Sequence, residues 1–303
     1  MSTLSIVITA YNEEKKIRVC LESAKFADEL IFVDNSSTDN TAKIAKEYTK
    51  HVYSQPNEPT KIDLQKNTGI EKATSDWVLV LDADEQISSE LRKEIKEVLE
   101  DDPKELNGFW MPRKNIIFDK WIQHCGWYPD FQLRLFRKGK GKYEKVHYHE
   151  PIAVVGQTAK LREHLIHSNY ERIGQVLHRN LQVYAPNEAD ELIRQGYSFN
   201  ARDAIRLPIQ EFLSRYFARQ GYKDGFHGLM LSLFMAIYHF IIFAYIWEKK
   251  KFADEGEKSV KAFESEFKES SKEIRYWVQK RQIDEERASL KKIGLRVKRK
   301  LRI

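Results

Sequence analysis

Three short apolar runs in the first 85 residues each end abruptly in polar side chains. They occupy residues 4–10 (LSIVITA), 30–33 (LIFV) and 77–81 (WVLVL). Continuous apolar runs of this length are typical of strands that are covered on both faces. After the first run, Ile17, Leu21 and Ala24 recur at helical spacing with Asn12 as a candidate N-cap, and residues 38–48 repeat the helical pattern after the second. The alternation of strand and helix predicts an α/β fold with a parallel sheet.

The polar residues that follow these runs are predicted to meet at one edge of the sheet. Tyr11 and Glu13 follow the first run, Asp34 the second, and Asp82 and Asp84 the third. The carboxyl ends of parallel strands share an edge, and ligands bind beyond it. Neither GxGxxG after the first strand nor GxxxxGK[ST] occurs in the chain, which argues against a dinucleotide fingerprint and a P-loop. A nucleotide would have to be held differently.

Asp82 and Asp84 stand one residue apart where the third apolar run ends. Two carboxylates so close repel each other unless a cation or several donors lie between them. Hard oxygen ligands suit Mg²⁺ or Mn²⁺, which take one or two protein carboxylates and complete their shells with water and phosphate. The alternative is a solvated turn at the end of a strand, because acidic pairs are common in turns.

Three ordered motifs carry a resemblance to a known family. SIVITAYNEE, VDNSSTDNT and VLVLDADE resemble the nucleotide-sugar half of family 2 glycosyltransferases. The match continues through KNTGIEKATSDW and WYPDFQLRLFRKGKGKYEKVHYHEP, and so covers roughly residues 4–170. It implies a GT-A fold, which is a Rossmann-like, mostly parallel sheet flanked by helices. The downstream half most resembles the bacterial subgroup that adds sugars to the lipopolysaccharide core.

The resemblance assigns roles to the polar edge of the sheet. It places Tyr11, Glu13 and Asp34 around the uracil and ribose of a nucleotide diphosphate sugar. It places Asp82 near the ribose and donor sugar, with a possible share in the metal site. Asp84 would bind the Mg²⁺ or Mn²⁺ ion that bridges the two phosphates.

Four further residues are candidates for binding the donor. Lys66, in a predicted helix, would contact the diphosphate or base, Arg134 would brace phosphates, and His149 and His167 would contact donor phosphate or acceptor. The alternatives are a solvated helical lysine, the solvated face of a strand and ordinary histidines. A zinc site is conceivable, but Cys20 and Cys125 are far apart in sequence, and the acidic pair already favours a harder metal.

The implied reaction is displacement at the anomeric carbon of the donor. A metal stabilises the leaving diphosphate, and an inverting enzyme also needs a general base for the attacking hydroxyl. Asp130 is the first candidate, because it begins a predicted strand at about the place of the acidic base motif of the family. Glu150 is the rival, since Pro129 precedes Asp130 where many relatives carry an adjacent Glu-Asp pair.

The second half of the chain predicts membrane contact. Residues 209–217 resemble a basic amphipathic helix, and residues 225–247 contain no Asp, Glu, Lys or Arg. The latter could span a bilayer, but a single crossing would put residues 249–251 and the basic tail opposite the cytoplasmic catalytic domain. This favours a helix lying in the interface or re-entering it. A helix buried in protein or in a dimer interface is the alternative. Residues 248–303 hold 18 Lys and Arg against 11 Asp and Glu, which favours anionic lipid over nucleic acid.

These patterns predict three segments: a GT-A domain at residues 1–200, membrane-associating helices at 201–248 and a basic helical tail at 249–303. Two cysteines provide no disulfide framework, and no secretory signal is visible, so a cytoplasmic catalytic domain is expected. The predicted function is an inverting, metal-dependent hexosyltransferase that passes a sugar, UDP-linked by preference, to a lipid-linked saccharide. It would act at the cytoplasmic membrane face, without nucleic acid, and a homo-oligomer is left open. A polyprenyl-phosphate glycosyltransferase and a non-catalytic scaffold that binds nucleotide sugar and membrane remain alternatives.

Overall fold

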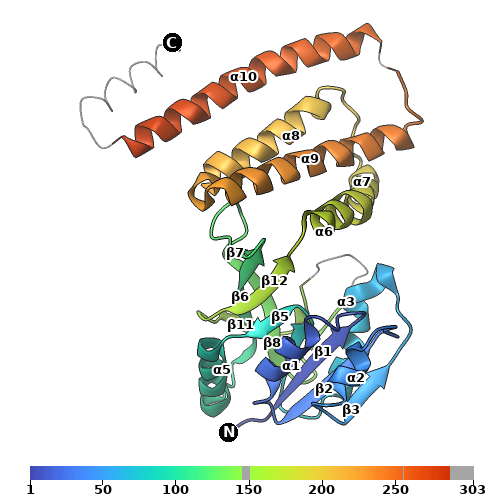
Figure 1. Ribbon diagram of the computed structural model, residues 1–303, viewed down its shortest axis with the longest axis vertical. Helices are drawn as coiled ribbons and strands as arrows, with labels where there is room; N and C mark the ends of the chain where they lie inside the picture. The colour runs from blue at the N-terminus through green and yellow to red at the C-terminus, as the bar shows by residue number, and fades with distance from the viewer. Residues whose placement is uncertain (145–150, 255, 287–303) are drawn as a thin grey trace. The chain divides into compact units, whose positions relative to one another are not determined.

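The computed structural model describes residues 1–144, 151–254 and 256–286 (Figure 1). The chain divides into two compact units. Unit 1 comprises Met1–Ile117 and Tyr128–Asn169, and unit 2 comprises Phe118–Trp127 and Tyr170–Ile303. The segment boundaries expected at residues 200 and 248 stay predictions.

Unit 1 is built on a mixed sheet whose first half is parallel. Its strand order is β3-β2-β1-β4-β8-β6-β12-β5, with β11 beside β6. The parallel strands are β1 (Leu4–Ala10), β2 (Glu29–Asp34), β3 (His51–Ser54) and β4 (Trp77–Asp82). The helices between them are α1 (Ile17–Ala24), α2 (Thr41–Ala45), α3 (Ile62–Gln65) and α4 (Asn67–Lys72), with a 3₁₀ turn at Pro59–Lys61. The parallel half of the GT-A fold is therefore as predicted.

The second half of the sheet reverses direction at β8, which pairs antiparallel with both β4 and β6. The remaining elements of unit 1 are β5 (Glu85–Ile87), α5 (Ser89–Asp101), β6 (Leu106–Ile117), β8 (Asp130–Arg137), β9 (Gly141–Lys142), β10 (Ala153–Val154), β11 (Gln157–Lys160) and β12 (Leu165–Tyr170). Strand β8 begins at Asp130, as the alternation of its residues predicts.

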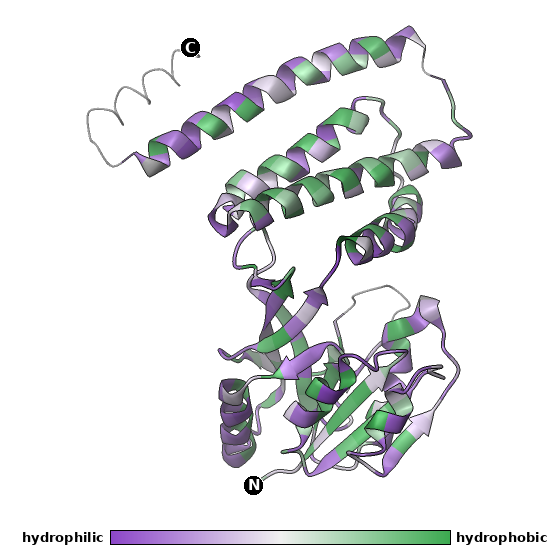
Figure 2. Cartoon of the chain, viewed as in Figure 1, coloured by the Kyte–Doolittle hydropathy of each residue, from purple (hydrophilic) through white to green (hydrophobic). Residues whose placement is uncertain are grey.

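Both faces of the parallel strands are buried, which explains their continuous apolar sequence. Ile6 and Ile8 of β1 face one core with α1 and α5, and Val7 faces a second core with α4. Helix α4 lies so close to the sheet that a Cβ on Gly69 would be 2.3 Å from Cγ1 of Val7. Figure 2 shows the resulting apolar strands between amphipathic helices.

The predicted N-cap of α1 is wrong. The helix begins at Ile17, and its N-cap residue is Lys16. Asn12 lies four residues before Lys16 and has a φ of 54°. The Asn12 side chain instead accepts a hydrogen bond of 2.8 Å from the backbone N–H of Thr38. Asn12 therefore joins two loops at the sheet edge.

Unit 2 is mainly helical. Its elements are β7 (Lys120–Trp121), α6 (Ile173–Leu177), α7 (Ala185–Arg194), α8 (Asp203–Leu213), α9 (Phe226–Lys249) and α10 (Glu257–Glu285). Two π-helical segments, His178–Tyr184 and Ser214–Ala218, precede α7 and follow α8, and a 3₁₀ turn occupies Gly221–Asp224.

The segment 118–127 is anchored inside unit 2 by the buried carboxylate of Asp224. This carboxylate accepts hydrogen bonds from the backbone N–H groups of Gln123 at 3.2 Å and His124 at 2.8 Å. Arg215 donates to the carbonyl oxygen of Cys125 at 3.0 Å. The loop that leads into β8 is thus held by specific polar contacts.

Helix α9 has two different faces. One face, with Tyr238, Ile242 and Ile246, packs on Ala185 and Ala189 of α7. A second face is exposed and apolar, and it consists of Phe226, Leu233, Ile237, Phe240 and Trp247. The intervals of seven, four, three and seven residues align these side chains on one stripe. Among the described residues, α9 is the one helix long and apolar enough to cross a membrane, by length and composition only.

The aromatic face expected on residues 209–217 packs inside unit 2. Tyr216 lies 6.3 Å from Tyr222, and Phe217 stacks on Trp277 of α10 at 6.2 Å between ring centroids. Arg215 forms an ion pair with Glu211 of α8. The exposed apolar side chains of unit 2 include those of α9 and a stripe on α10, namely Val260, Phe263, Phe267, Ile274 and Val278.

Candidate active site

The polar ends of β1, β2 and β4 meet at one edge of the sheet, as predicted. In the strand register, Ala10 pairs with Asp34 and Thr9 pairs with Asp82. Asp34 and Asp82 therefore flank β1 on opposite sides. Two strand spacings separate their backbones by about 10 Å. That span suits an elongated ligand lying across the strand ends.

The two loops next to Asp34 are joined to each other. The Asp34 carboxylate accepts a hydrogen bond of 3.1 Å from the backbone N–H of Ser37, and the N–H of Glu13 donates to Oγ1 of Thr41 at 2.7 Å. Tyr11 follows β1 and is 44% exposed, so its ring is open to a ligand. The structure brings Tyr11, Glu13 and Asp34 to the same edge.

A network of amide side chains beside Asp34 is missing from the sequence-based prediction. Gln55 donates to Asn35 at 2.7 Å, and Asn35 donates to Gln65 at 3.3 Å. Thr68 donates to the side-chain oxygen of Gln55 at 2.6 Å. Amides offer donors and acceptors at fixed positions, which is the chemistry that a nucleobase edge requires. Their separation in sequence hides this grouping, and only the position of Gln65 directly before Lys66 hints at it.

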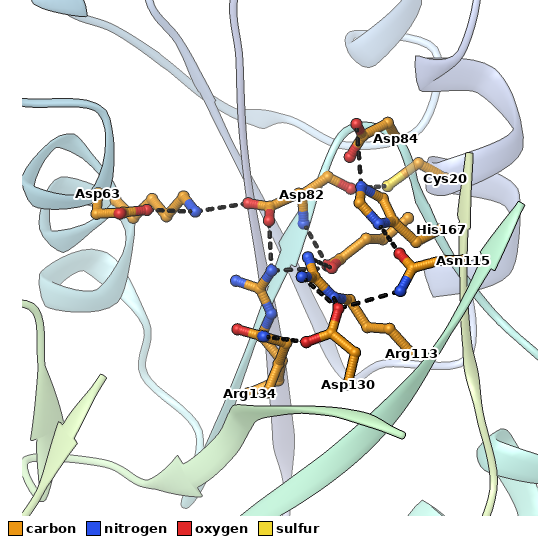
Figure 3. Close-up of polar contacts among 12 residues, drawn as sticks. Cys20, Asp63, Asp82, Asp84, Arg113, Asn115, Asp130, Arg134 and His167 are labelled. Atoms are coloured by element: carbon orange, nitrogen blue, oxygen red, sulfur yellow. Dashed lines mark hydrogen bonds and ion pairs between the residues drawn. The ribbon is translucent and has the colours of Figure 1, made fainter. Parts of the chain in front are cut away.

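The carboxylate of Asp82 is held between two cations (Figure 3). Lys66, at the junction of α3 and α4, lies 2.6 Å from its Oδ1, and Arg134 of β8 contacts its Oδ2. Lys66 also pairs with Asp63 at 2.9 Å. Burial acts to raise the pKa of Asp82, but Arg134 and Lys66 hold that pKa well below its ordinary value. Asp82 is therefore an ionised acceptor with a fixed position.

Arg134 does not lie on a solvated strand face. Its residue is 5% exposed, and its guanidinium also pairs with the buried carboxylate of Glu85 at 2.8 Å. Glu85 in turn accepts from the backbone N–H of Asp82 at 3.0 Å. Arg134 and Glu85 thus both hold Asp82 in place. A direct contact between Arg134 and a phosphate stays a prediction.

Asp84 faces His167 of β12. Asp84 Oδ2 lies 3.4 Å from Nε2 of His167, and both side chains are largely buried. Burial acts to raise the pKa of Asp84, while the adjacent His167 lowers it below its usual value. Neighbouring ligands of an octahedral ion of this size lie about 3 Å apart. The pair therefore fits one side of a divalent cation, with water and phosphate oxygens as the remaining ligands.

The charges around Asp82 and Asp84 do not balance. The polar network drawn in Figure 3 contains five carboxylates, of Asp63, Asp82, Asp84, Glu85 and Asp130, and three permanent cations, of Lys66, Arg113 and Arg134. The carboxylates of this ion-pair network thus outnumber its permanent cations, although Lys16, outside the network, also lowers the pKa of Asp84. A divalent cation at Asp84 would reduce the excess of negative charge.

Asp130 lies in the same network, at the start of β8. Its side chain is 25% exposed, and Oδ2 accepts from Arg113 at 2.6 Å. Asn115 and Gln132 donate to the carboxylate at 3.1 and 2.9 Å. Burial acts to raise the pKa of Asp130, but Arg113 and these donors lower it. The carboxylate is therefore ionised at neutral pH, fixed in orientation and accessible.

Two of the candidate residues, Glu150 and His149, lie outside the described residues. The choice between Asp130 and Glu150 as the base thus stays a prediction. His167 lies within strand β12 and His164 directly before it, where His164 forms a 3.0 Å hydrogen bond with the Tyr128 hydroxyl. Within the described part of the chain, no three His, Cys, Asp or Glu side chains are grouped closely enough to hold a metal by themselves.

The chain belongs to glycosyl transferase family 2, because the model of that family matches residues 5–161, more than half of its length. The protein is therefore a glycosyltransferase of the GT-A type, and the resemblance seen in its motifs is confirmed. Of the candidate site residues that the structure describes, all except His167 lie within this matched range.

Curated relatives cover most of the chain. The lipopolysaccharide core biosynthesis glycosyltransferase LpsC of Rhizobium meliloti is 28% identical over 261 residues, which are 81% of this chain and 92% of LpsC. An uncharacterised glycosyltransferase of Rickettsia typhi is also 28% identical over 261 residues. The match covers 82% of this chain and 88% of the Rickettsia protein. The similarity to the lipopolysaccharide core subgroup is thus confirmed.

Among solved structures, TarS of S. aureus (residues 1–349, in complex with UDP-GlcNAc) is 15% identical with a TM-score of 0.44, covering 87% of this chain and 90% of that one. Glucosyl-3-phosphoglycerate synthase of Mycobacterium tuberculosis, in complex with Mg²⁺ and UDP, is 24% identical with a TM-score of 0.30. That match covers 38% of this chain and 43% of the synthase.

Proposed function

We propose that this protein is an inverting, metal-dependent glycosyltransferase that moves a sugar from a nucleotide diphosphate donor, UDP-linked by preference, to a lipid-linked saccharide. It acts at the cytoplasmic face of the membrane, and the acceptor belongs to a cell-envelope glycan such as a lipopolysaccharide core. The observation that carries the proposal is the ordered network of ion pairs around Asp82 and Asp84, in which carboxylates outnumber permanent cations and Asp84 lies beside His167.

The donor lies across the ends of β2, β1 and β4 in this proposal. Asp34, Tyr11 and Glu13 contact the uridine, while the amides of Gln55, Asn35 and Gln65 define the wall of its pocket. Asp82 accepts hydrogen bonds from hydroxyls of the ribose or donor sugar, because it is ionised and already fixed by Lys66 and Arg134. Asp84 and His167 hold the Mg²⁺ or Mn²⁺ ion, which stabilises the charge that develops on the leaving diphosphate.

Asp130 is the general base of the proposed reaction. Its ionised carboxylate accepts the proton as the acceptor oxygen attacks the anomeric carbon. Arg113, Asn115 and Gln132 restrict its rotation, and Oδ1, which accepts from Gln132, retains one further lone pair for the proton. The low pKa makes it a weak base, so proton transfer occurs late, when bond formation has made the hydroxyl proton acidic.

The exposed stripe of α9 supports contact with a membrane. The opposite face of α9 is joined to charged residues: Lys249 pairs with Asp190 of α7 at 2.5 Å, and His239 lies 3.7 Å from Glu211 of α8. A bilayer-spanning α9 would draw these helices and their carboxylates into hydrocarbon, which is costly. An α9 that lies in the interface keeps them in water while Leu233, Ile237 and Phe240 enter the lipid.

Helix α10 repeats this arrangement with more charge. By helical spacing, Lys258, Lys261, Lys268 and Lys272 lie on the side of α10 away from its apolar stripe, and Figure 2 shows hydrophilic and hydrophobic residues alternating along the helix. Basic residues near an anionic leaflet each contribute about 1 kcal/mol of attraction. The membrane would therefore bring the enzyme to a lipid-linked acceptor.

The test is a panel of uridine and guanosine diphosphate sugars, each incubated with Mg²⁺ or Mn²⁺ and with or without a bacterial lipid extract. Released nucleoside diphosphate and labelled lipid product are both measured. We expect release from one UDP-sugar, dependent on metal and strongly increased by the lipid extract. A matched control without protein measures spontaneous hydrolysis.

The other outcomes separate the alternative functions. A product that forms with purified polyprenyl phosphate and survives the Asp130→Ala substitution would indicate a polyprenyl-phosphate glycosyltransferase, because a phosphate oxygen needs no protein base. Donor and metal binding without turnover, with every sugar and with the lipid extract, would indicate a non-catalytic scaffold.

A further inference from the structure

Asn115 of β6 connects the candidate base to the candidate metal ligands (Figure 3). Its side chain is fully buried. Nδ2 donates to Oδ2 of Asp130 at 3.1 Å, and Oδ1 lies 2.7 Å from Nδ1 of His167. On the other side of the ring, Nε2 of His167 lies 3.4 Å from Oδ2 of Asp84. The four side chains thus form one continuous chain of polar contacts.

The charge of Asp130 determines which way the Asn115 amide points. Arg113 and the surrounding donors outweigh burial and keep the pKa of Asp130 below its usual value, so this carboxylate is ionised. An ionised carboxylate can only accept hydrogen bonds. The NH₂ group of Asn115 must therefore face Asp130, which turns the amide oxygen toward His167.

The orientation of the amide then determines the tautomer of His167. An amide oxygen can only accept, so Nδ1 of His167 must carry the proton in their 2.7 Å hydrogen bond. A cation can be bound only by the unprotonated Nε2, whose lone pair then faces the carboxylate of Asp84 across the ion.

We infer that Asn115 is a positioning residue: it holds His167 in the Nδ1–H tautomer and so directs the Nε2 lone pair at a divalent cation bound by Asp84. The inference rests on the proposed function, because it assumes a cation at Asp84. Hydrogen bonds that orient a metal-binding histidine in this way change metal affinity by about 10–100-fold when they are lost. The same amide fixes Asp130, so one residue aligns the base and the metal ligand.

The experiment measures Mn²⁺ affinity in the presence of UDP, from the electron paramagnetic resonance signal of free Mn²⁺. Asn115→Leu removes the acceptor for Nδ1–H, and we expect Mn²⁺ affinity to fall about 10–100-fold. Asn115→Asp retains an acceptor, so the affinity should stay within about threefold, while turnover falls because a second carboxylate faces Asp130. This separation of affinity from turnover is not expected if Asn115 only supports the fold.

Gln132→Leu is the matched control for the affinity measurement. Gln132 donates to Oδ1 of Asp130 at 2.9 Å, and within the described residues it forms no hydrogen bond with His167. Its substitution should therefore leave Mn²⁺ affinity unchanged. A loss of affinity equal to that of Asn115→Leu would show that Asp130 acts on the metal without the histidine, and would overturn the inference.

A second measurement uses the wild-type protein and so does not depend on the folding of a variant. The ¹⁵N spectrum of the His167 ring, assigned with His167→Gln, is recorded in the complex with Mg²⁺ and UDP. We expect a protonated Nδ1 and an unprotonated Nε2. The opposite tautomer, or unchanged Mn²⁺ affinity in folded Asn115→Leu, would overturn this inference alone. Failure of wild-type protein to bind Mn²⁺ with UDP would overturn the proposed function as well.

Discussion

Arg134 and Glu85 form a 2.8 Å ion pair in which both side chains are buried. The pair lies directly under the acidic motif, because Arg134 also contacts the carboxylate of Asp82 and Glu85 accepts from the Asp82 N–H. The position of Asp82 therefore depends on a buried ion pair as well as on its own contacts.

Arg134→Leu should destabilise unit 1 strongly. The substitution leaves the buried carboxylate of Glu85 without its principal partner, and breaking a buried ion pair costs about 3–5 kcal/mol. The two units can unfold separately, so the measurement must report on unit 1 alone. We therefore measure hydrogen exchange of peptides from β4 and β8 across a urea series. The control is Arg18→Leu, which removes an exposed ion pair with Glu47 and should leave the exchange midpoint nearly unchanged. Equal midpoints for both variants would contradict the role of Arg134.

Unit 1 should lose stability in acid through Asp82. Arg134 and Lys66 outweigh burial and depress the pKa of this carboxyl in the folded protein, whereas the unfolded value is about 3.9. Its contribution is therefore complete above the unfolded pKa and is lost as pH falls below about 4 toward the folded pKa. The difference in unfolding free energy between wild type and Asp82→Asn should be constant from pH 7 to 5 and shrink below pH 4. A difference that grows on acidification would contradict this account.

Asp130→Asn should reduce turnover about 10²–10⁴-fold, as expected for loss of a general base. The affinity for Mn²⁺ and UDP should remain within about threefold of wild type, because Asn can still contact Arg113 and Asn115 through its oxygen. Glu150→Gln, assayed in parallel, tests the rival candidate. Full activity of Asp130→Asn together with loss of activity in Glu150→Gln would transfer the role to Glu150.

Membrane binding should depend on the exposed stripe of α9. In flotation assays with vesicles of neutral and anionic phospholipid, the triple substitution of Leu233, Ile237 and Phe240 by Ser should lower binding at least about tenfold, because about 25 cal/mol is lost per Å² of apolar area no longer buried in lipid. Val19→Ser and Ile62→Ser together form the control, since these exposed apolar residues belong to unit 1. Unchanged flotation, combined with conversion of a dimer to a monomer, would show that a second copy covers the stripe.

Strands could be predicted where burial of their faces imposes an apolar or alternating pattern on neighbouring residues. Residues 77–81 are continuously apolar because β4 is covered on both faces, and Asp82 and Asp84 mark the point where the chain leaves the core. The start of β8 at Asp130 follows from alternation in the same way. These signals lie within a few residues of each other, so a single sequence contains them.

The partners of the candidate residues could not be predicted in this way. Arg134 pairs with residues 49 and 52 positions earlier in the chain, and Asn115 meets His167 across 52 positions. Asparagine is a common N-cap residue, but the side chain of Asn12 instead accepts a hydrogen bond from the backbone N–H of Thr38, 26 residues away. Such contacts are decided by the pairing order of strands, which local propensity does not encode.

The most direct test of the account is a crystal structure with UDP and Mn²⁺, in which the anomalous signal of manganese locates the metal. We predict a manganese peak within coordination distance of Asp84 and His167, the diphosphate bound to it, and the uracil beside Asp34 and the amides of Gln55 and Gln65. A manganese peak or a nucleotide at another face of unit 1, with Asp84 and His167 unchanged, would contradict the central claim.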